Sequence, residues 1–201
     1  MNTIWHNLLK NNLEVYNEIT DESFSKLLLI CNIQKVKEGE SLISLGEMTD
    51  SIYFLCSGLL RAYTVDSHDC AKEYNKIFFT ENMFPASMSA LVSGTESQFA
   101  IEALEDSVVI RINYKKFREL LGLCTDLMNF YVNYLEKNWI VRKEEAEVSF
   151  VFDDAKARYL KFCNLYPDLV RRLPLKHVAS SLGVTSTQLS RIRKELKNQH
   201  M

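Results

Sequence analysis

Polar and basic side chains gather between positions 186 and 194. An arginine there can make two hydrogen bonds to one guanine in the major groove, and a glutamine can do the same with adenine. Arg191 and Gln188 are the candidates for those two contacts. Together with their neighbours, they form the set of predicted DNA-binding residues: Ser186, Thr187, Gln188, Ser190, Arg191 and Lys194.

Two short helices joined by a turn would position these side chains. Apolar residues recur at helical spacing on both sides of Gly183, which can adopt the positive φ that ends a helix. Ala179 is small where two helices would cross, and Thr185 or Ser186 can cap the second helix. Residues 175–196 are therefore predicted to form a helix-turn-helix. An ordinary helical hairpin with a solvated face is the alternative.

The charge distribution agrees with a nucleic-acid partner at this end of the chain. The net charge is −2, but residues 155–201 carry +8 and the remaining residues −10. Basic side chains gain from a phosphate backbone because they release its condensed counterions. One basic part joined to an acidic part is what a protein needs when only one end contacts DNA.

The first 124 residues follow a different pattern. Residues 2–12 and 21–31 read as short helices, with Thr20 or Asp21 capping the second. Short apolar or alternating runs then succeed one another with turn residues between them, which predicts a small antiparallel barrel or roll. The expected strands are residues 41–45, 52–56, 59–65, 74–79, 98–103 and 108–112.

Residues 125–149 contain no Gly or Pro and are predicted to form one long helix, capped by Thr125 or Asp126. Two apolar stripes run along it, and periodicity does not decide which of them faces its own roll and which faces a second copy. A helix that packs wholly within one chain is the alternative. One stripe contains Met128, Val132, Leu135 and Trp139, with Arg142, and the other contains Leu127, Tyr131, Tyr134 and Val141.

The order of these parts resembles the CRP/FNR superfamily of bacterial transcription regulators. The similarity runs from about residue 19 to residue 196, and the helix-turn-helix follows the roll in the same order. The resemblance implies a cyclic-nucleotide-binding-like roll, a long dimerisation helix with its seam at the stripe from Met128 to Trp139, and Arg191 as a DNA-reading residue. The matching motifs are Lys-Glu-Gly-Glu at 37–40, Gly-Glu at 46–47, Asp-Ser-Ile-Tyr-Phe-Leu at 50–55, Gly58 with Arg61, and the segments 78–84, 102–107 and 114–117.

The chain departs from the family where its members bind cyclic AMP. Pro85-Ala86 stands in place of the Gly-Glu pair, and Ser97-Gln98 in place of the Arg-Ser pair. A buried phosphate without its cation would lose charge-assisted hydrogen bonds of about 1.5–3 kcal/mol each. We therefore expect no control by cyclic AMP in the usual mode. Either apolar residues such as Phe84 fill the roll, or another small molecule binds near Arg61, Ser87, Ser97, Gln98 and Arg142.

No cofactor, metal site or catalytic set is expected. The five cysteines, Cys31, Cys56, Cys70, Cys124 and Cys163, are scattered, and His6 and His68 lack the pattern of a haem site. No nucleophile–base–orienter set appears, so the chain is not predicted to be an enzyme. No apolar run approaches a membrane span and no signal peptide is apparent, which predicts a cytoplasmic protein.

These observations predict an α+β fold in three parts. Residues 1–124 form the sensor roll of jelly-roll type, residues 125–149 the dimerisation helix, and residues 150–201 the DNA-binding domain. In that domain the Phe-Val-Phe at 150–152 is expected to pack as a hinge against both domains, and Asp153 or Asp154 to cap the next helix.

The predicted function is a homodimeric regulator that binds a pseudo-palindromic operator. RNA polymerase and an unidentified small molecule are further partners to consider. The rival interpretations are a protein-interaction module with a ligand-free roll and a regulator gated by a small molecule.

Overall fold

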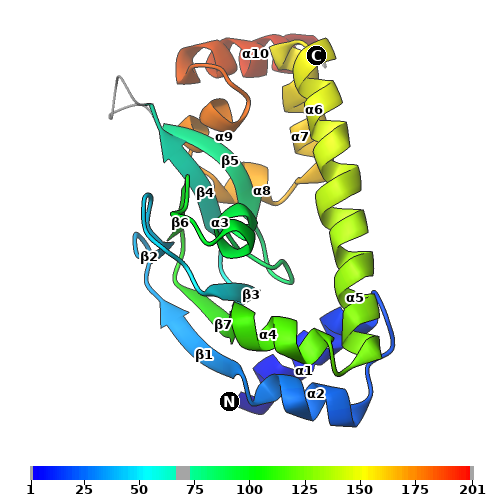
Figure 1. Cartoon of the computed structure of the whole chain (residues 1–201). Helices are drawn as coiled ribbons and strands as arrows, with labels where there is room; N and C mark the ends of the chain where they lie inside the picture. Colours follow the sequence, from blue (N-terminus) through cyan, green and yellow to red (C-terminus); the bar gives the residue numbers. More distant parts are fainter. Residues whose placement is uncertain (1, 67–72, 200–201) are drawn as a thin grey trace. The chain divides into compact units, whose positions relative to one another are not determined.

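A computed structural model describes residues 2–66 and 73–199 (Figure 1), so His68 and Cys70 lie outside the described residues. The chain divides into two compact units. The first comprises Met1–Thr64 and Ile77–Trp139, and the second comprises Val65–Lys76 and Ile140–Met201. Within the described ranges no helix combines the length and the apolar character that crossing a membrane requires.

The first unit is built on two sheets. A three-stranded sheet has the order β1 (Cys31–Val36), β7 (Ser107–Asn113), β3 (Ser51–Ser57). A four-stranded sheet has the order β2 (Ser41–Ile43), β6 (Ala100–Ala103), β4 (Leu60–Val65), β5 (Glu73–Phe79). The β1–β7, β3–β7, β2–β6 and β4–β6 pairs are antiparallel. The predicted α+β fold with an antiparallel roll is confirmed.

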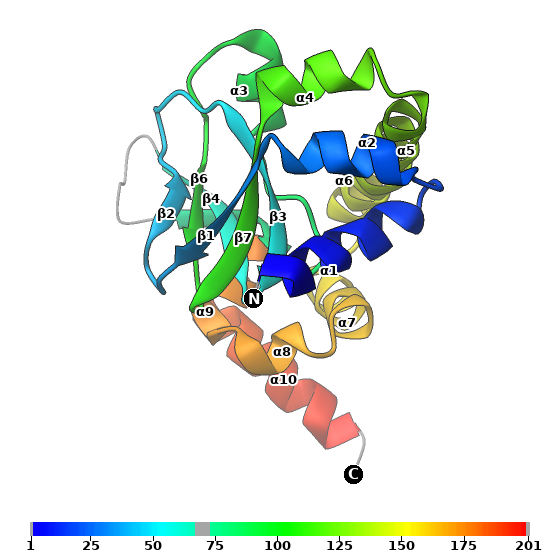
Figure 2. The ribbon, with the colours of Figure 1, turned by 90° about the horizontal axis from the view of Figure 1, so that it is seen from below.

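Four helices accompany the roll: α1 (Asn2–Glu14), α2 (Asp21–Leu28), α3 (Met88–Ser93) and α4 (Tyr114–Leu121). Figure 2 shows α1, α2 and α4 beside the β1–β7–β3 sheet. Thr20 caps α2 as expected, since its hydroxyl accepts a hydrogen bond from the Ser23 N–H at 3.2 Å.

The prediction of a helix to residue 31 was wrong, because Cys31 already begins β1. Strand β1 is half polar, and its pairing with β7 along its whole length makes it a strand despite that composition. The sequence pattern predicted no strand at residues 31–36.

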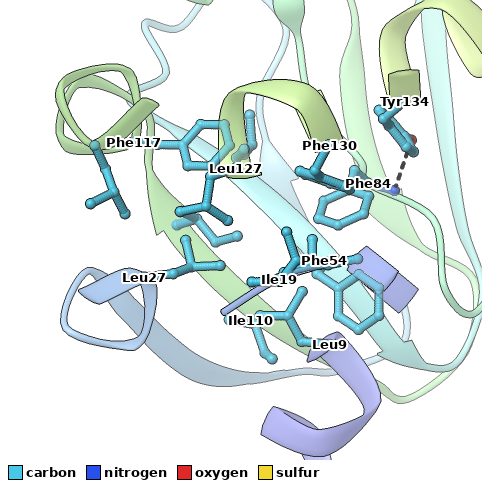
Figure 3. Packing of buried hydrophobic residues seen from close by; sticks show 14 of the residues in the cluster. Leu9, Ile19, Leu27, Phe54, Phe84, Ile110, Phe117, Leu127, Phe130 and Tyr134 are labelled. Atoms are coloured by element: carbon cyan, nitrogen blue, oxygen red, sulfur yellow. Dashed lines mark hydrogen bonds between the residues drawn. The ribbon is translucent and has the colours of Figure 1, made fainter. Parts of the chain in front are cut away.

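Strand β3 explains how the core of the first unit is organised. Its residues alternate between two apolar clusters, so the strand is buried on both faces. Phe54 and its same-face neighbours meet the helices, in the cluster that Figure 3 shows, while Tyr53 and Leu55 lie in the second cluster with residues of β4, β6 and β7. Such a strand reads as a continuous apolar run, which is how residues 52–56 were recognised.

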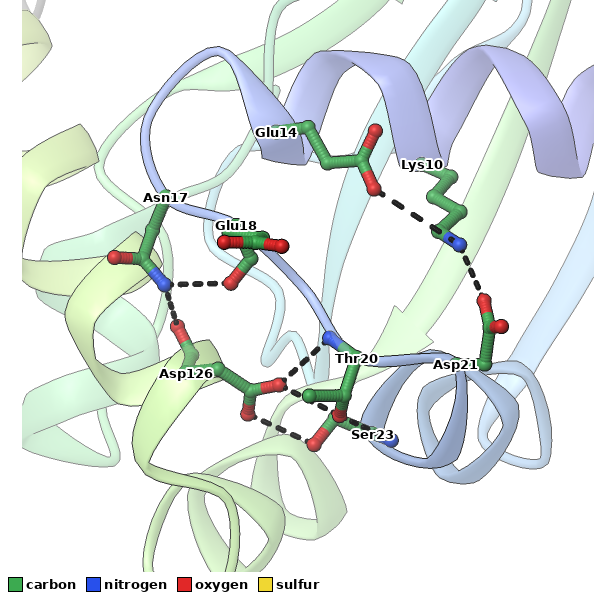
Figure 4. A network of polar contacts seen from close by, with 8 residues as sticks. All are labelled: Lys10, Glu14, Asn17, Glu18, Thr20, Asp21, Ser23 and Asp126. Atoms are coloured by element: carbon green, nitrogen blue, oxygen red, sulfur yellow. Dashed lines mark hydrogen bonds and ion pairs between the residues drawn. The ribbon is translucent and has the colours of Figure 1, made fainter.

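Helix α5 (Thr125–Leu135) begins differently from its prediction. Cys124 is its N-terminal flanking residue and makes no side-chain cap, so the capping role expected of Thr125 or Asp126 was wrong. The Asp126 carboxylate instead accepts hydrogen bonds from the Thr20 N–H, the Thr20 hydroxyl and the Ser23 hydroxyl at 2.8–3.0 Å (Figure 4). This carboxylate therefore ties α5 to the start of α2.

The predicted long helix is helical from residue 125 to residue 152, but it is not α-helical throughout. A π-helical segment, Glu136–Val141, separates α5 from α6 (Arg142–Phe152). A π segment inserts extra residues into the turn, so an apolar stripe drawn with one period does not continue across it.

The second unit continues with α7 (Ala155–Leu165), α8 (Leu169–Arg172), α9 (Leu175–Ser181) and α10 (Ser186–Gln199). Asp154 caps α7, because its carboxylate accepts the Ala157 N–H at 2.8 Å. Phe150, Val151 and Phe152 form the end of α6 and are 63%, 75% and 81% exposed. The packed hinge expected at these residues was therefore wrong.

Candidate nucleic-acid interface

Helices α9 and α10 and the turn between them have the expected helix-turn-helix construction. Val178, Ala179, Leu182 and Leu189 are buried, as the apolar spacing requires. Gly183 has φ +69°, the left-handed conformation that ends α9. The Gly183 and Val184 N–H groups donate to the Ser180 and Ala179 carbonyls at 3.2 and 3.0 Å. This is a Schellman motif, so the turn satisfies the last carbonyls of α9 by itself.

Thr185 caps α10 in a reciprocal arrangement with Gln188. The Thr185 hydroxyl accepts the Gln188 N–H at 3.2 Å, and the Gln188 side-chain oxygen accepts the Thr185 N–H at 2.8 Å. Of the two cap candidates, the structure selects Thr185. The side-chain oxygen that Gln188 would use on adenine already accepts the Thr185 N–H and the Thr185 hydroxyl, so a bidentate base contact would require it to leave the cap.

The remaining polar face of α10 lies in solvent. All six predicted DNA-binding residues are exposed, and further exposed cations lie on the same helix at Arg193 and Lys197. The helix thus presents a polar and basic surface on the side opposite the buried Leu189. A helix of this kind can enter a major groove, with side chains near its N-terminus on base edges and cations on phosphates.

Arg158 of α7 hydrogen-bonds to the turn that follows α9. Its guanidinium donates to the Leu182 carbonyl at 3.1 and 3.3 Å and to the Asp153 carbonyl at 2.6 Å, and it lies 5.2 Å from the centre of the Phe150 ring. It therefore joins the ends of α6 and α9. In the sequence Arg158 is only one of the basic residues between positions 155 and 201, because nothing in its spacing indicates these carbonyl partners.

In the roll, the structure brings together two of the predicted effector-binding residues. The Ser87 and Ser97 hydroxyls lie 2.8 Å apart and both residues are buried. The Ser97 hydroxyl also lies 2.6 Å from the Phe99 carbonyl. A hydroxyl has one proton, so Ser97 donates to that carbonyl and Ser87 donates to Ser97.

The other three effector candidates do not join this pair. Arg61 is buried against Glu102 at 3.1 Å, its cross-strand partner on β6, with its guanidinium 3.9 Å from the centre of the Tyr63 ring. Gln98 is exposed, and Arg142 is an exposed residue at the start of α6 in the second unit. Beside Arg142, Lys143 pairs with Glu147 at 3.6 Å.

The stripes of α5 differ in burial. Leu127, Phe130 and Tyr134 are buried in the core of the first unit. Met128, Leu135 and Trp139 are half-buried and Val132 is 43% exposed. Of the predicted stripe that includes Leu127 and Tyr134, Tyr131 is half-buried and Val141 is 49% exposed. Met128 and Trp139 of the other stripe also pack against the core of the first unit, so the burial separates the two stripes only at Leu127, Tyr134 and Val132.

The comparisons with known proteins concern both units. The family model of the cyclic nucleotide-binding domain matches residues 33–122. The cAMP-activated global transcriptional regulator CRP of Salmonella typhimurium is 22% identical over 192 residues, which cover 90% of each chain. A CRP/FNR-family protein from Eubacterium rectale has a TM-score of 0.70 at 14% identity, covering 94% of this chain and 88% of that one. The regulator CLP of Xanthomonas campestris also has a TM-score of 0.70, at 15% identity, with 90% and 93% covered.

The chain is thus similar to members of the CRP/FNR superfamily along nearly its whole length, and residues 33–122 match the cyclic nucleotide-binding domain.

Against that family, the ligand cassette between β5 and β6 lacks its charged groups. Pro85 and Ala86, at the positions of the Gly-Glu pair, are buried, and Ser97 takes the place of the arginine. Phe84 packs on Phe54 and Tyr134 with ring centres 5.0 Å apart in both cases. The cavity among these rings measures about 20 Å³, room for about one water molecule, and its lining is almost wholly apolar.

The described cysteines and histidines assemble no cofactor site. No three potential metal ligands lie together in the described ranges. Burial raises the pKa of the Cys31 and Cys56 thiols to about 12, so both stay protonated. His177, which the sequence analysis did not single out, is buried in α9 and hydrogen-bonded to Asn75.

Proposed function

We propose that this CRP/FNR-type chain is a homodimeric, sequence-specific DNA-binding transcription regulator that acts in the cytoplasm, and not an enzyme. The observation that carries the proposal is the exposed polar and basic face of α10, presented by a Schellman turn and a reciprocal cap. The reading set is the predicted one, with Arg191 on guanine, while Ser186, Thr187, Ser190 and Lys194 contact bases or phosphates and Gln188 divides its role between cap and base.

Dimerisation supplies the second reading helix. The proposed seam is Met128, Val132, Leu135 and Trp139, supported by the 43% exposure of Val132 and by the burial of Leu127 and Tyr134 on the other stripe. Two helices related by a two-fold axis enter successive major grooves about 34 Å apart, so the operator is a pseudo-palindrome. The working parts are the roll (residues 1–124), the dimerisation helix (125–149) and the DNA-binding domain (150–201).

The proposal excludes cyclic AMP as the usual effector. Its support is the absence of a carboxylate and a guanidinium at the two described cassette positions and the aromatic packing around Phe84. If an unidentified small molecule acts on the roll, Arg61, Ser87, Ser97, Gln98 and Arg142 remain its proposed contacts. RNA polymerase remains a proposed partner of the DNA-bound dimer.

The test begins with selection of bound sites from random DNA, followed by titration of the selected and a scrambled duplex at two salt concentrations. Arg191→Ala should cost about 1–3 kcal/mol on the selected site and relax the preference at one base position. The matched control is Lys197→Ala, an exposed cation of the last turn of α10. This substitution should weaken binding to both duplexes alike. The slope of log affinity against log salt concentration should become shallower by about one.

Two results would contradict the proposal. If Arg191→Ala weakens both duplexes equally, its role in reading a base is wrong. If the selection returns no site that exceeds the salt-dependent background, the chain is a protein-interaction module whose basic end is incidental.

A further inference from the structure

The first residues of β5 are hydrogen-bonded to α9, and both belong to the second unit. The Asn75 N–H donates to the Ser180 hydroxyl at 2.9 Å, and that hydroxyl donates to the Glu73 carbonyl at 2.7 Å. The Asn75 side-chain amide donates to the His177 carbonyl at 3.2 Å and lies 3.3 Å from His177 Nδ1. Four contacts thus join one turn of α9 to two residues of the strand, Glu73 and Asn75.

The Ser180 hydroxyl makes hydrogen bonds to β5 that a neighbouring strand would otherwise make. Glu73 and Asn75 are two residues apart, so the carbonyl of one and the N–H of the other lie on the same edge of β5. β5 is the last strand of its sheet, and one hydroxyl of α9 satisfies both groups. Asn75 and His177 are each only 6% exposed, so breaking the contact would leave polar groups buried without these partners.

The contact leaves the reading surface untouched. Val178, Ala179 and Leu182 of α9 are buried together with Leu189 of α10, while the predicted reading residues are exposed. Helix α9 is therefore held on one side by β5 and carries α10 on another. Strand β5 itself continues into the first unit, where Phe79 lies in the apolar cluster of the roll.

We propose that Asn75 and Ser180 form a latch that keeps α9 attached to the first residues of β5 within the second unit, and that two-site DNA binding depends on this attachment. The inference rests on the proposed function and adds to it a contact within the second unit, made by Glu73 and Asn75 of β5. Releasing the latch loosens the two reading helices and lowers the effective concentration of the second one on a palindrome.

The experiment uses the full chain with Ser180→Ala, which removes one hydroxyl, and with Asn75→Ala as a second variant. The matched control is Ser181→Ala, because the Ser181 hydroxyl donates only to the Val178 carbonyl within α9. The first readout is hydrogen exchange at residues 73–76 and 175–182. The second is affinity for the selected palindrome and for a single half-site of it.

In Ser180→Ala we expect the Asn75 amide to exchange roughly tenfold faster. We also expect the ratio of palindrome to half-site affinity to fall roughly tenfold, with half-site binding unchanged. Ser181→Ala should change neither. The proposal is overturned if hydrogen exchange is unchanged in both latch variants. It is also overturned if exchange is faster but the ratio of palindrome to half-site affinity does not fall, because the contact would then only cover the edge of β5. If the unaltered protein selects no DNA site, the proposed function itself fails, and the exchange data still report the contact.

Discussion

Replacing Asp126 by Asn tests how the start of α5 is held. The carboxylate accepts four hydrogen bonds: two from Thr20, one from Ser23 and one from the Leu127 N–H. Each carboxylate oxygen receives two of them, so an Asn in the same place turns an NH₂ group toward two donors. Losing two bonds to a charged acceptor at about 1.5 kcal/mol each predicts destabilisation of about 3 kcal/mol.

The contribution of Asp126 to stability should depend on pH. Desolvation of Asp126 opposes its ionisation, but the hydrogen bonds from Thr20, Ser23 and Leu127 outweigh it and hold the pKa of this carboxyl below its usual value. A lowered pKa in the folded state gives stability that is complete above the unfolded value, near 3.9, and is lost as the pH falls through the folded value. The difference between wild type and Asp126→Asn should therefore be constant from pH 7 to about pH 5 and shrink only below about pH 4.

The assay is urea unfolding at several pH values, with Asp21→Asn as the control. Asp21 is an exposed acid in the same network whose partner is Lys10, and its loss should not measurably change stability. A difference that already shrinks between pH 7 and pH 5, or an Asp126→Asn variant as stable as wild type, would refute the reasoning.

Two further predictions concern glycines and cysteines. Gly58→Ala should destabilise the protein by about 3 kcal/mol, because the new Cβ would lie 2.1 Å from the Ser107 Oγ and the residue has φ +105°. Gly183→Ala should cost only about 1–2 kcal/mol, from the strain of its left-handed backbone, because the atom nearest to the new Cβ would be a Phe150 ring carbon at 3.6 Å. Thermal melting measures both, and equal costs would contradict the close contact at Gly58. Iodoacetamide at pH 8 should leave Cys31 and Cys56 of the native protein largely unmodified, because their thiols have pKa values of about 12, and should label both after unfolding. Mass spectrometry measures the labelling. Rapid labelling of either cysteine in the native protein would show that its thiol does not stay buried.

The helix-turn-helix was predictable because every signal in it is local. Gly183 ends α9, Thr185 caps α10 and Ala179 lies at the buried face, all within a few residues of one another. The roll was recognised from β3, β4, β5, β6 and β7, whose apolar runs and turns also act over short distances, although their ends differ by one or two residues from the expected ones.

Predictions failed where a partner distant in the sequence decides. Strand β1 is half polar and becomes a strand because β7 pairs with it. Asp126 has the sequence position of a cap, but Thr20 and Ser23, more than 100 residues earlier, provide better-placed donors. Ser97 and Ser87 were predicted to offer polar groups to a ligand, and each hydrogen-bonds the other in a buried position.

A helix-turn-helix that follows a roll of the CRP/FNR kind could be predicted from the sequence alone, as could the lack of the side chains that hold cyclic AMP in the family. Helical periodicity, capping residues and local charge suffice for this, because they depend on neighbours along the chain. The tertiary structure was needed to find that Arg158 and Asn75 hold α9 and that Leu127 and Tyr134 of α5 are buried. Those outcomes depend on hydrogen bonds and packing between segments far apart in sequence, whose cost or gain no local pattern contains.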